Sequence, residues 1–217
     1  MQFDQYVNKV FCINLDRRTD RWEECLKEFE RCGITQYERI SGYVHTADTK
    51  QRNGHIGCTR SHRLLLRRIA ESDWARVLVL EDDFQAIKAL TFQADFAMLT
   101  DFVPLDFDIL YIGGSYGTVP LARINAHVIK VDRVHTTSSY IITRDFAKTF
   151  SNDIDRDFPN PLDQGPIDCI FSNYLSFYRS YIIQPRLIIQ RDGYSDLSLC
   201  YSANATGMMD TRHEQMV

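Results

Sequence analysis

The chain has 217 residues, of which 44% are hydrophobic and 25% charged, and its formal net charge is −4. This length suits one sizeable core and is short for two, and the composition is that of an ordinary globular protein. The negative balance argues against a nucleic-acid partner, which needs a broad basic surface.

A strand, a helix and a second strand are predicted first. The apolar run VFCINL at 10–15 is typical of a strand. A stripe with the i, i+3, i+4, i+7 spacing of a helix follows, formed by Trp22, Cys25, Leu26 and Phe29. Asp16 is a candidate N-cap for this helix, and Gly33 is a candidate stop. A short strand is expected at 37–40.

A second helix is predicted at 58–72. Its apolar stripe consists of Cys58, His62, Leu65, Leu66 and Ile69. The opposite face is basic, and we expect Arg63 and Arg67 on it to be solvated.

A continuous apolar run at 77–80 predicts a strand buried on both faces, which is typical of a parallel sheet covered by helices. Further strands are expected at 108–112, 127–131, 138–142 and 181–189, and further helices at 145–150 and 167–175. Strands that alternate with helices indicate an α/β fold with a mostly parallel central sheet. We expect residues 1–200 to form a single domain and 201–217 a C-terminal tail.

Three carboxylates, Glu81, Asp82 and Asp83, follow the 77–80 run directly. In a parallel α/β sheet, ligands bind outside the carboxyl ends of the strands. Along an extended segment Glu81 and Asp83 would point to one side, where they repel each other unless a cation lies between them. Mg²⁺ and Mn²⁺ favour such oxygen ligands and share them with phosphates. The residues therefore indicate a metal–diphosphate site; a solvated acidic strand end is the alternative.

The six cysteines contain no C-x-x-C pair, so we expect them to be reduced. The longest apolar runs fall well short of the ~20 residues that span a bilayer. The N-terminal stretch MQFDQYVNKV lacks a signal-peptide pattern. These features predict a cytoplasmic chain without a transmembrane segment.

Four segments carry a family resemblance: VFCINLDRRTDRW; GCTRSHRLLLRRI with VLVLEDDF; HTTSSYIITRDFAKTF; and GPIDCIFSNYL with QPRLIIQ. In this order and spacing the sequence resembles glycosyltransferase family 25, which includes lipopolysaccharide and procollagen galactosyltransferases. The resemblance implies a GT-A fold, a single Rossmann-like α/β domain. It also implies Mn²⁺ or Mg²⁺ and inverting transfer of a hexose from UDP-galactose or UDP-glucose to a glycan or protein hydroxyl.

The resemblance gives roles to the carboxylates. Asp83 matches the last acidic residue of the family motif and would ligate the metal directly, while Glu81 would act through water or on the ribose. Asp82 would bond a backbone group or a donor hydroxyl. Asp168 matches the family's Pro-x-Asp segment and is the candidate general base. Asp163 is its rival for that role, and Asp168 could equally be an ordinary acidic residue in a first helical turn.

Donor-binding candidates lie near the predicted strand ends. Asn14, Arg17 and Arg21 lie at and after the end of the first strand, and arginine forks suit phosphate oxygens; a solvated first helical turn is the alternative. The resemblance adds a Ser–His pair beside the nucleotide, here Ser61 and His62; a satisfied core histidine is the alternative for His62. Further candidates around the donor, acceptor or metal are His135, Gln190, Asp196 and His213.

Two other function classes compete with a sugar transferase. A nucleotidyltransferase would normally carry a Gly-rich or Lys/Arg-rich loop after its first strand, and INLDRRTDR has no glycine. A non-catalytic relative that binds nucleotide-sugars or glycans would not need an intact EDD motif, so the motif favours an enzyme.

Overall fold

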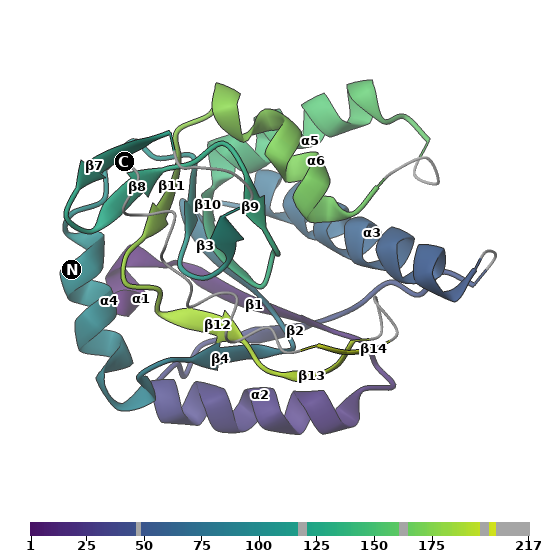
Figure 1. Ribbon diagram of the computed structural model, residues 1–217, viewed down its shortest axis with the longest axis horizontal. Coiled ribbons are helices and arrows are strands. Elements are labelled where there is room, and N and C mark those ends of the chain that lie inside the picture. Colours follow the sequence, from purple (N-terminus) through teal and green to yellow (C-terminus); the bar gives the residue numbers. More distant parts are fainter. Residues whose placement is uncertain (47–48, 117–120, 161–164, 196–199, 203–217) are drawn as a thin grey trace.

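The computed structural model describes residues 1–46, 49–116, 121–160, 165–195 and 200–202. Within these ranges eight strands form one central sheet (Figure 1). In sheet order they are β2 (Glu38–Ser41), β1 (Lys9–Asn14), β3 (Arg76–Glu81), β10 (Ser139–Thr143), β5 (Ile109–Tyr111), β11 (Ser180–Ile183), β8 (Val128–Lys130) and β7 (Ala122–Asn125).

The predicted mostly parallel α/β sheet is confirmed. β1 pairs parallel with β2 and β3, and β11 pairs parallel with β5. β10 lies antiparallel between β3 and β5, and β8 lies antiparallel between β11 and β7. Six of the eight described strands therefore share one direction, and their carboxyl ends meet at one edge of the sheet.

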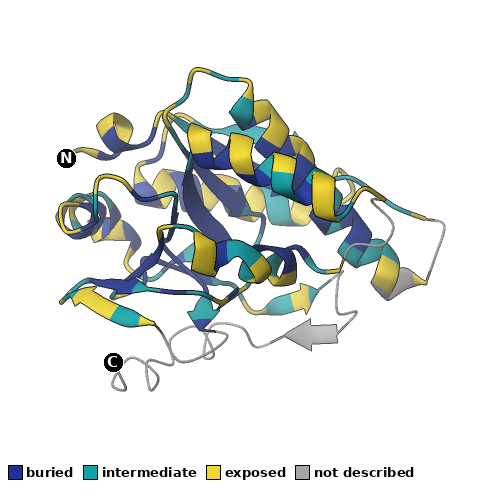
Figure 2. Ribbon diagram, turned by 90° about the horizontal axis from the view of Figure 1, so that it is seen from above, coloured by how far each residue is buried: buried dark blue, intermediate teal, exposed yellow. Residues whose placement is uncertain are grey.

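Helices cover both faces of the sheet (Figures 1 and 2). One face packs on α3 (Lys50–Ala70), α5 (Arg144–Asp157) and α6 (Ile167–Tyr174), and the other on α1 (Phe3–Tyr6), α2 (Thr19–Cys32) and α4 (Phe92–Thr100). Short 3₁₀ turns are η1 (Ala89–Thr91) and η3 (Leu175–Phe177). None of the described helices is both long enough and apolar enough to cross a membrane.

Three small strand pairs lie outside the central sheet. β4 (Phe84–Ala86) pairs with β12 (Ile188–Gln190), β6 (Ser115–Tyr116) with β9 (Val134–His135), and β13 (Gly193–Ser195) with β14 (Cys200–Ser202). The β4–β12 pair brings Gln190 and the segment after it beside the carboxylates that follow β3.

Alternation along β3 builds both cores. Leu78 and Leu80 pack into the core beneath α1, α2 and α4, whereas Val77 and Val79 pack into the core beneath α3, α5 and α6. All four side chains are fully buried. Each such burial is worth ~1.5–3 kcal/mol, so the strand that carries the carboxylates is fixed from both sides.

The ends of α2 agree only in part with the predictions. Gly33 caps the helix with φ 66°, the left-handed conformation that glycine adopts freely, so the predicted stop is confirmed. The predicted N-cap at Asp16 is wrong, because α2 begins at Thr19. Asp16 instead accepts a hydrogen bond from Ser41 at 2.9 Å, which ties the ends of β1 and β2 together.

Helix α3 begins about two turns before the predicted start, and Thr49 caps it by accepting from the Arg52 N–H at 3.4 Å. The expectation of a solvated Arg63 is wrong. Arg63 is buried, because α5 packs across this part of α3 and supplies Asp155 as its ion-pair partner. Arg67 pairs with the same carboxylate at 2.7 Å but remains half exposed, as predicted.

The predicted strand at 181–189 is two strands. β11 ends at Ile183 and β12 begins at Ile188, with Pro185 between them. Proline has no N–H to give to a sheet, so β11 stops and the chain turns to pair with β4. The described cysteines, Cys12, Cys25, Cys32, Cys58 and Cys169, carry free thiols, in agreement with the sequence-based prediction.

The close approach of β12 to β5 predicts that Gly113→Ala will destabilise the fold. A Cβ at Gly113 would lie 2.3 Å from Ser139 Oγ and 2.5 Å from the Ile188 carbonyl oxygen. The backbone must shift to remove these close contacts. Urea denaturation of the variant should therefore show a free energy of unfolding that is lower by ~1–3 kcal/mol. Gly165→Ala is the matched control, since nothing lies within 4 Å of its added Cβ; equal stabilities of the two variants would contradict the argument.

Candidate functional site

A cleft of about 810 Å³ opens at the carboxyl ends of β1 and β3. Its walls come from the loops after β1 and β2, from α3, from the start of α6, and from β12 and β13. Glu81, Asp82 and Asp83 all line it. The cleft thus lies at the edge of the sheet where α/β proteins bind ligands, and its volume is within the range of small-molecule sites.

Asp82 is held by the end of β1 and by α2. Its carboxylate accepts a hydrogen bond from the Asn14 amide at 2.7 Å and an ion-paired one from Arg21 at 2.5 Å. Asn14 is itself fixed, since its Oδ1 accepts from Arg39 Nε at 2.8 Å. With buried partners on both oxygens, Asp82 anchors the turn after β3 to β1 and α2.

Glu81 turns toward α3. Its Oε1 accepts from Thr137 Oγ1 at 2.5 Å and lies 3.1 Å from His62 Nε2. Burial acts to raise the pKa of Glu81, but the hydrogen bond and charge of His62, the hydrogen bond from Thr137 and the charge of Arg21 together hold it below its ordinary value. Glu81 is therefore ionised in the cleft at neutral pH.

Asp83 has far fewer stabilising contacts. Its Oδ1 is buried without a hydrogen-bond partner among the described residues, and its Oδ2 has the Gln190 amide at 3.4 Å and Arg21 at 3.6 Å. Burial first, and then the charge of Glu81, raise the pKa of Asp83 to about 7. An under-coordinated carboxylate beside a second negative charge is a natural ligand for a cation.

The side-to-side alternation predicted for Glu81, Asp82 and Asp83 is interrupted. β3 ends at Glu81 and the next two residues form a turn. As a result Arg21 contacts both Asp82 and Asp83, and each of the three carboxylates has a different environment.

Asp168 reaches the cleft from the first turn of α6. Its Oδ2 accepts from the Thr136 N–H at 3.2 Å, and its Oδ1 from the Cys169 N–H at 2.9 Å. Thr136 has φ 72°, a strained conformation for a β-branched residue. The Thr136–Thr137 turn thus contacts two carboxylates, Asp168 through a backbone N–H and Glu81 through a hydroxyl.

Most of the other predicted donor-binding residues line the cleft, and His135 does not. Arg17, Arg21, His62 and Gln190 line the cleft together with Asp82 and Glu81. Ser61 also lines it, but its hydroxyl donates to the Gly57 carbonyl and accepts from the Tyr43 N–H, both at 2.7 Å, so it joins α3 to the loop after β2. His135 lies exposed on β9 and is not among the described residues that line the cleft. Asp163, Asp196 and His213 lie outside the described residues.

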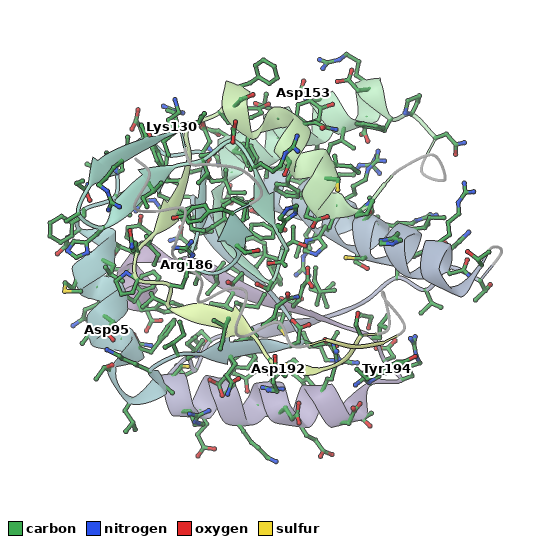
Figure 3. All side chains as sticks on the ribbon, viewed as in Figure 1. Asp95, Lys130, Asp153, Arg186, Asp192 and Tyr194 are labelled. Atoms are coloured by element: carbon green, nitrogen blue, oxygen red, sulfur yellow. The ribbon has the colours of Figure 1, made fainter. Side chains whose placement is uncertain are left out.

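The C-terminal wall of the cleft comes from β13. Arg21 donates to the Tyr194 carbonyl at 2.8 Å, and Figure 3 shows Asp192 and Tyr194 on the segment that runs beside α2. Sequence reasoning missed Tyr194, Cys58 and the Thr136–Thr137 turn. Cys58 had a usable signal, because it lies four residues before His62 on the same helical face. The Thr136 turn had none, since a left-handed threonine has no sequence signature.

Comparison with known proteins gives two similar sequences. A putative glycosyltransferase R655 of Acanthamoeba polyphaga mimivirus is 35% identical over 35% of this chain and 28% of that protein. A procollagen lysyl hydroxylase and glycosyltransferase of the same virus is 24% identical over 67% of this chain and 20% of that protein. The chain thus spans less than a third of the length of these relatives.

No protein-family model matches the chain. Among solved structures, the crystal structure of A197 from STIV superimposes with a TM-score of 0.46 at 12% identity, covering 89% of this chain and 92% of that chain.

The raised pKa of Asp83 predicts a pH-dependent stability in the presence of chelator. Its folded-state pKa of about 7 lies above the unfolded value, so its contribution to stability is present at low pH and is lost as the pH rises through about 7. Between pH 4 and pH 8, the free energy of unfolding of wild type, derived from thermal melts, should fall by a few kcal/mol. The expected loss is on the order of 1.4 kcal/mol per unit of pKa shift. Asp83→Asn should flatten that fall.

The exposed Asp73→Asn is the control and should follow wild type. Parallel melting curves for wild type and Asp83→Asn would show that Asp83 is not the strained carboxylate.

Proposed function

We propose that this chain is a metal-dependent inverting glycosyltransferase, related to glycosyltransferase family 25. It would transfer galactose or glucose from a UDP-sugar to a hydroxyl of a glycan or protein. The observation that carries the proposal is the buried carboxylate of Asp83 in the turn after β3. Its Oδ1 has no described hydrogen-bond partner, and it lies in a nucleotide-sized cleft beside the ionised Glu81. The relatives named as glycosyltransferases support the same reaction class.

The donor set fits Mn²⁺ or Mg²⁺. Asp83 would hold the ion directly through the oxygen that has no other described partner, and Glu81 and Gln190 offer oxygen atoms nearby. When bound, the ion would neutralise the charge that develops on the departing diphosphate. Without it, a diphosphate would face two carboxylates, and the electrostatics of the cleft would oppose binding.

The donor would be oriented by the residues after β1. Arg17 and Arg21 line the cleft, and Arg21 is placed by Asp82 and by the Tyr194 carbonyl. A guanidinium held on two sides presents its remaining N–H groups in fixed directions, which suits phosphate oxygens. The Asn14–Asp82–Arg21 network would therefore act as a positioning unit for the diphosphate.

Asp168 would take the proton from the acceptor hydroxyl. Its carboxylate is held by two backbone N–H groups, which leaves room on each oxygen for a further hydrogen bond from an incoming hydroxyl. Removal of that proton as the hydroxyl attacks the sugar on the side opposite the diphosphate gives inversion. The position of Asp168 on α6, on a different element from the β3 carboxylates, fits this division of roles.

The metal requirement gives the first test. UDP should bind in the presence of Mn²⁺ and far more weakly in excess chelator, because Glu81 and Asp83 would then repel the diphosphate. Isothermal titration calorimetry measures both affinities. Asp83→Asn should abolish the difference between the two conditions, and the exposed Asp73→Asn should leave it intact. Equal affinities of wild type for UDP with and without Mn²⁺ would rule out a metal–diphosphate site.

The base assignment gives the second test. Asp168→Asn keeps the shape of the side chain and removes its basicity, so sugar transfer should fall by ~10²–10⁴-fold. UDP affinity with Mn²⁺ should change little, since Asp168 faces the acceptor. Transfer is followed as UDP release that depends on an added acceptor, chosen from a panel of glycans and peptides.

Asp163→Asn tests the rival carboxylate in the same assay. Near-normal transfer by Asp168→Asn would reject Asp168 as the base, and a large loss in Asp163→Asn alone would transfer the role to Asp163.

A further inference from the structure

A second set of metal-ligating side chains lies in the cleft wall formed by α3. Cys58 and His62 are one helical turn apart and face the cleft, where they meet Glu81 at the end of β3. The cysteine sulfur, a histidine ring nitrogen and a carboxylate oxygen of the three lie within 4.8 Å of one another. The Cys58 thiol takes no part in the proposed transfer. Its sulfur is a softer metal ligand than the oxygens of Asp83.

The spacing is close to that of a tetrahedral zinc site. With Zn–S ~2.3 Å and Zn–N or Zn–O ~2.0–2.1 Å, ligand atoms lie ~3.3–3.6 Å apart. His62 Nε2 and Glu81 Oε1 are already 3.1 Å apart. The Cys58 sulfur therefore needs to move by ~1.2 Å at most to reach the upper end of this spacing, which lies within the reach of a side-chain rotation at Cys58. The fourth position would face the cleft and be open to water or a ligand.

The surroundings of the group hold its ligands in place. His62 Nδ1 is hydrogen-bonded to the hydroxyl of the fully buried Tyr140 at 2.7 Å, and Thr137 donates to Glu81 at 2.5 Å. Zinc-bound histidines regularly have such a partner on the other ring nitrogen. A tyrosine hydroxyl both donates and accepts, so it suits either tautomer of His62.

We propose that Cys58, His62 and Glu81 form a binding site for a thiophilic divalent cation such as Zn²⁺, distinct from the manganese site at Asp83. On binding, the Cys58 thiol releases its proton to solvent, the His62 proton resides on Nδ1 facing Tyr140, and Nε2 donates its lone pair to the ion. Thiolate and imidazole favour Zn²⁺ over Mn²⁺, whereas the all-oxygen environment of Asp83 has the opposite preference. Glu81 is shared, so occupancy of the thiolate site would withdraw it from the diphosphate site.

Cobalt titration of the full chain tests the proposal, because thiolate coordination gives Co²⁺ a near-ultraviolet charge-transfer band. Wild type should develop this band to saturation at one equivalent of Co²⁺, and Zn²⁺ should remove it. Cys58→Ser should abolish the band, and Tyr140→Phe should weaken Co²⁺ binding by ~10–100-fold through loss of the partner of His62.

Two controls distinguish this site from adventitious thiol binding and from the Asp83 site. Cys169 is exposed, so Cys169→Ser tests for adventitious binding and should retain the band. Asp83→Asn should also retain it, although the same variant should lose Mn²⁺-dependent UDP binding; the two sites can thus fail independently. Absence of the band in wild type, its survival in Cys58→Ser or its loss in Cys169→Ser would overturn the proposal.

A measurement without substitutions covers the case in which Cys58→Ser does not fold. X-ray absorption of the zinc-loaded wild-type chain should show one sulfur ligand at ~2.3 Å together with nitrogen and oxygen ligands. If only oxygen and nitrogen atoms coordinate the zinc, the ion is bound elsewhere and the thiolate site is rejected.

Discussion

The site depends on one electrostatic constraint: three carboxylates follow one another at the end of β3, a strand whose four central residues are fully buried. The chain meets it in three ways. Asp82 is ion-paired with Arg21 and accepts a hydrogen bond from Asn14, Glu81 is stabilised by His62 and Thr137, and Asp83 has only weak contacts. A buried pair of like charges is costly. Because Asp83 has the weakest contacts of the three, the repulsion from Glu81 and the cost of burial act mainly on its carboxylate. A cation beside Asp83 would relieve this repulsion.

Much of this arrangement could be predicted from sequence, for a physical reason. The run at 77–80 is apolar without interruption, and such a run is typical of a strand covered on both faces. The position of Glu81, Asp82 and Asp83 directly after it then places them at the ligand-binding edge of the sheet. The stop at Gly33 was predictable because a left-handed cap has a strong residue preference. These features are local, and local features are what a sequence pattern reports.

The missed features depend on contacts between distant segments. Arg63 looked like a surface residue until α5 supplied Asp155, ninety-two positions later. The antiparallel β10 between β3 and β5 cannot be inferred from its own apolar pattern, which is the same for either direction. Its placement nevertheless matters most for the site, since it brings Tyr140 beneath His62 and positions the preceding Thr136–Thr137 turn over Glu81.

That turn links the two ends of the proposed chemistry. Thr136 holds a left-handed conformation that costs a β-branched residue on the order of 1–3 kcal/mol. Two hydrogen bonds oppose this cost, one from the Thr136 N–H to Asp168 and one from the Thr137 hydroxyl to Glu81. The geometry of the turn is therefore supported by both carboxylates at once. Protonation of Glu81, or a ligand that drew its carboxylate away, would weaken one of these supports, so the orientation of Asp168 would be coupled to the state of Glu81 through two adjacent residues.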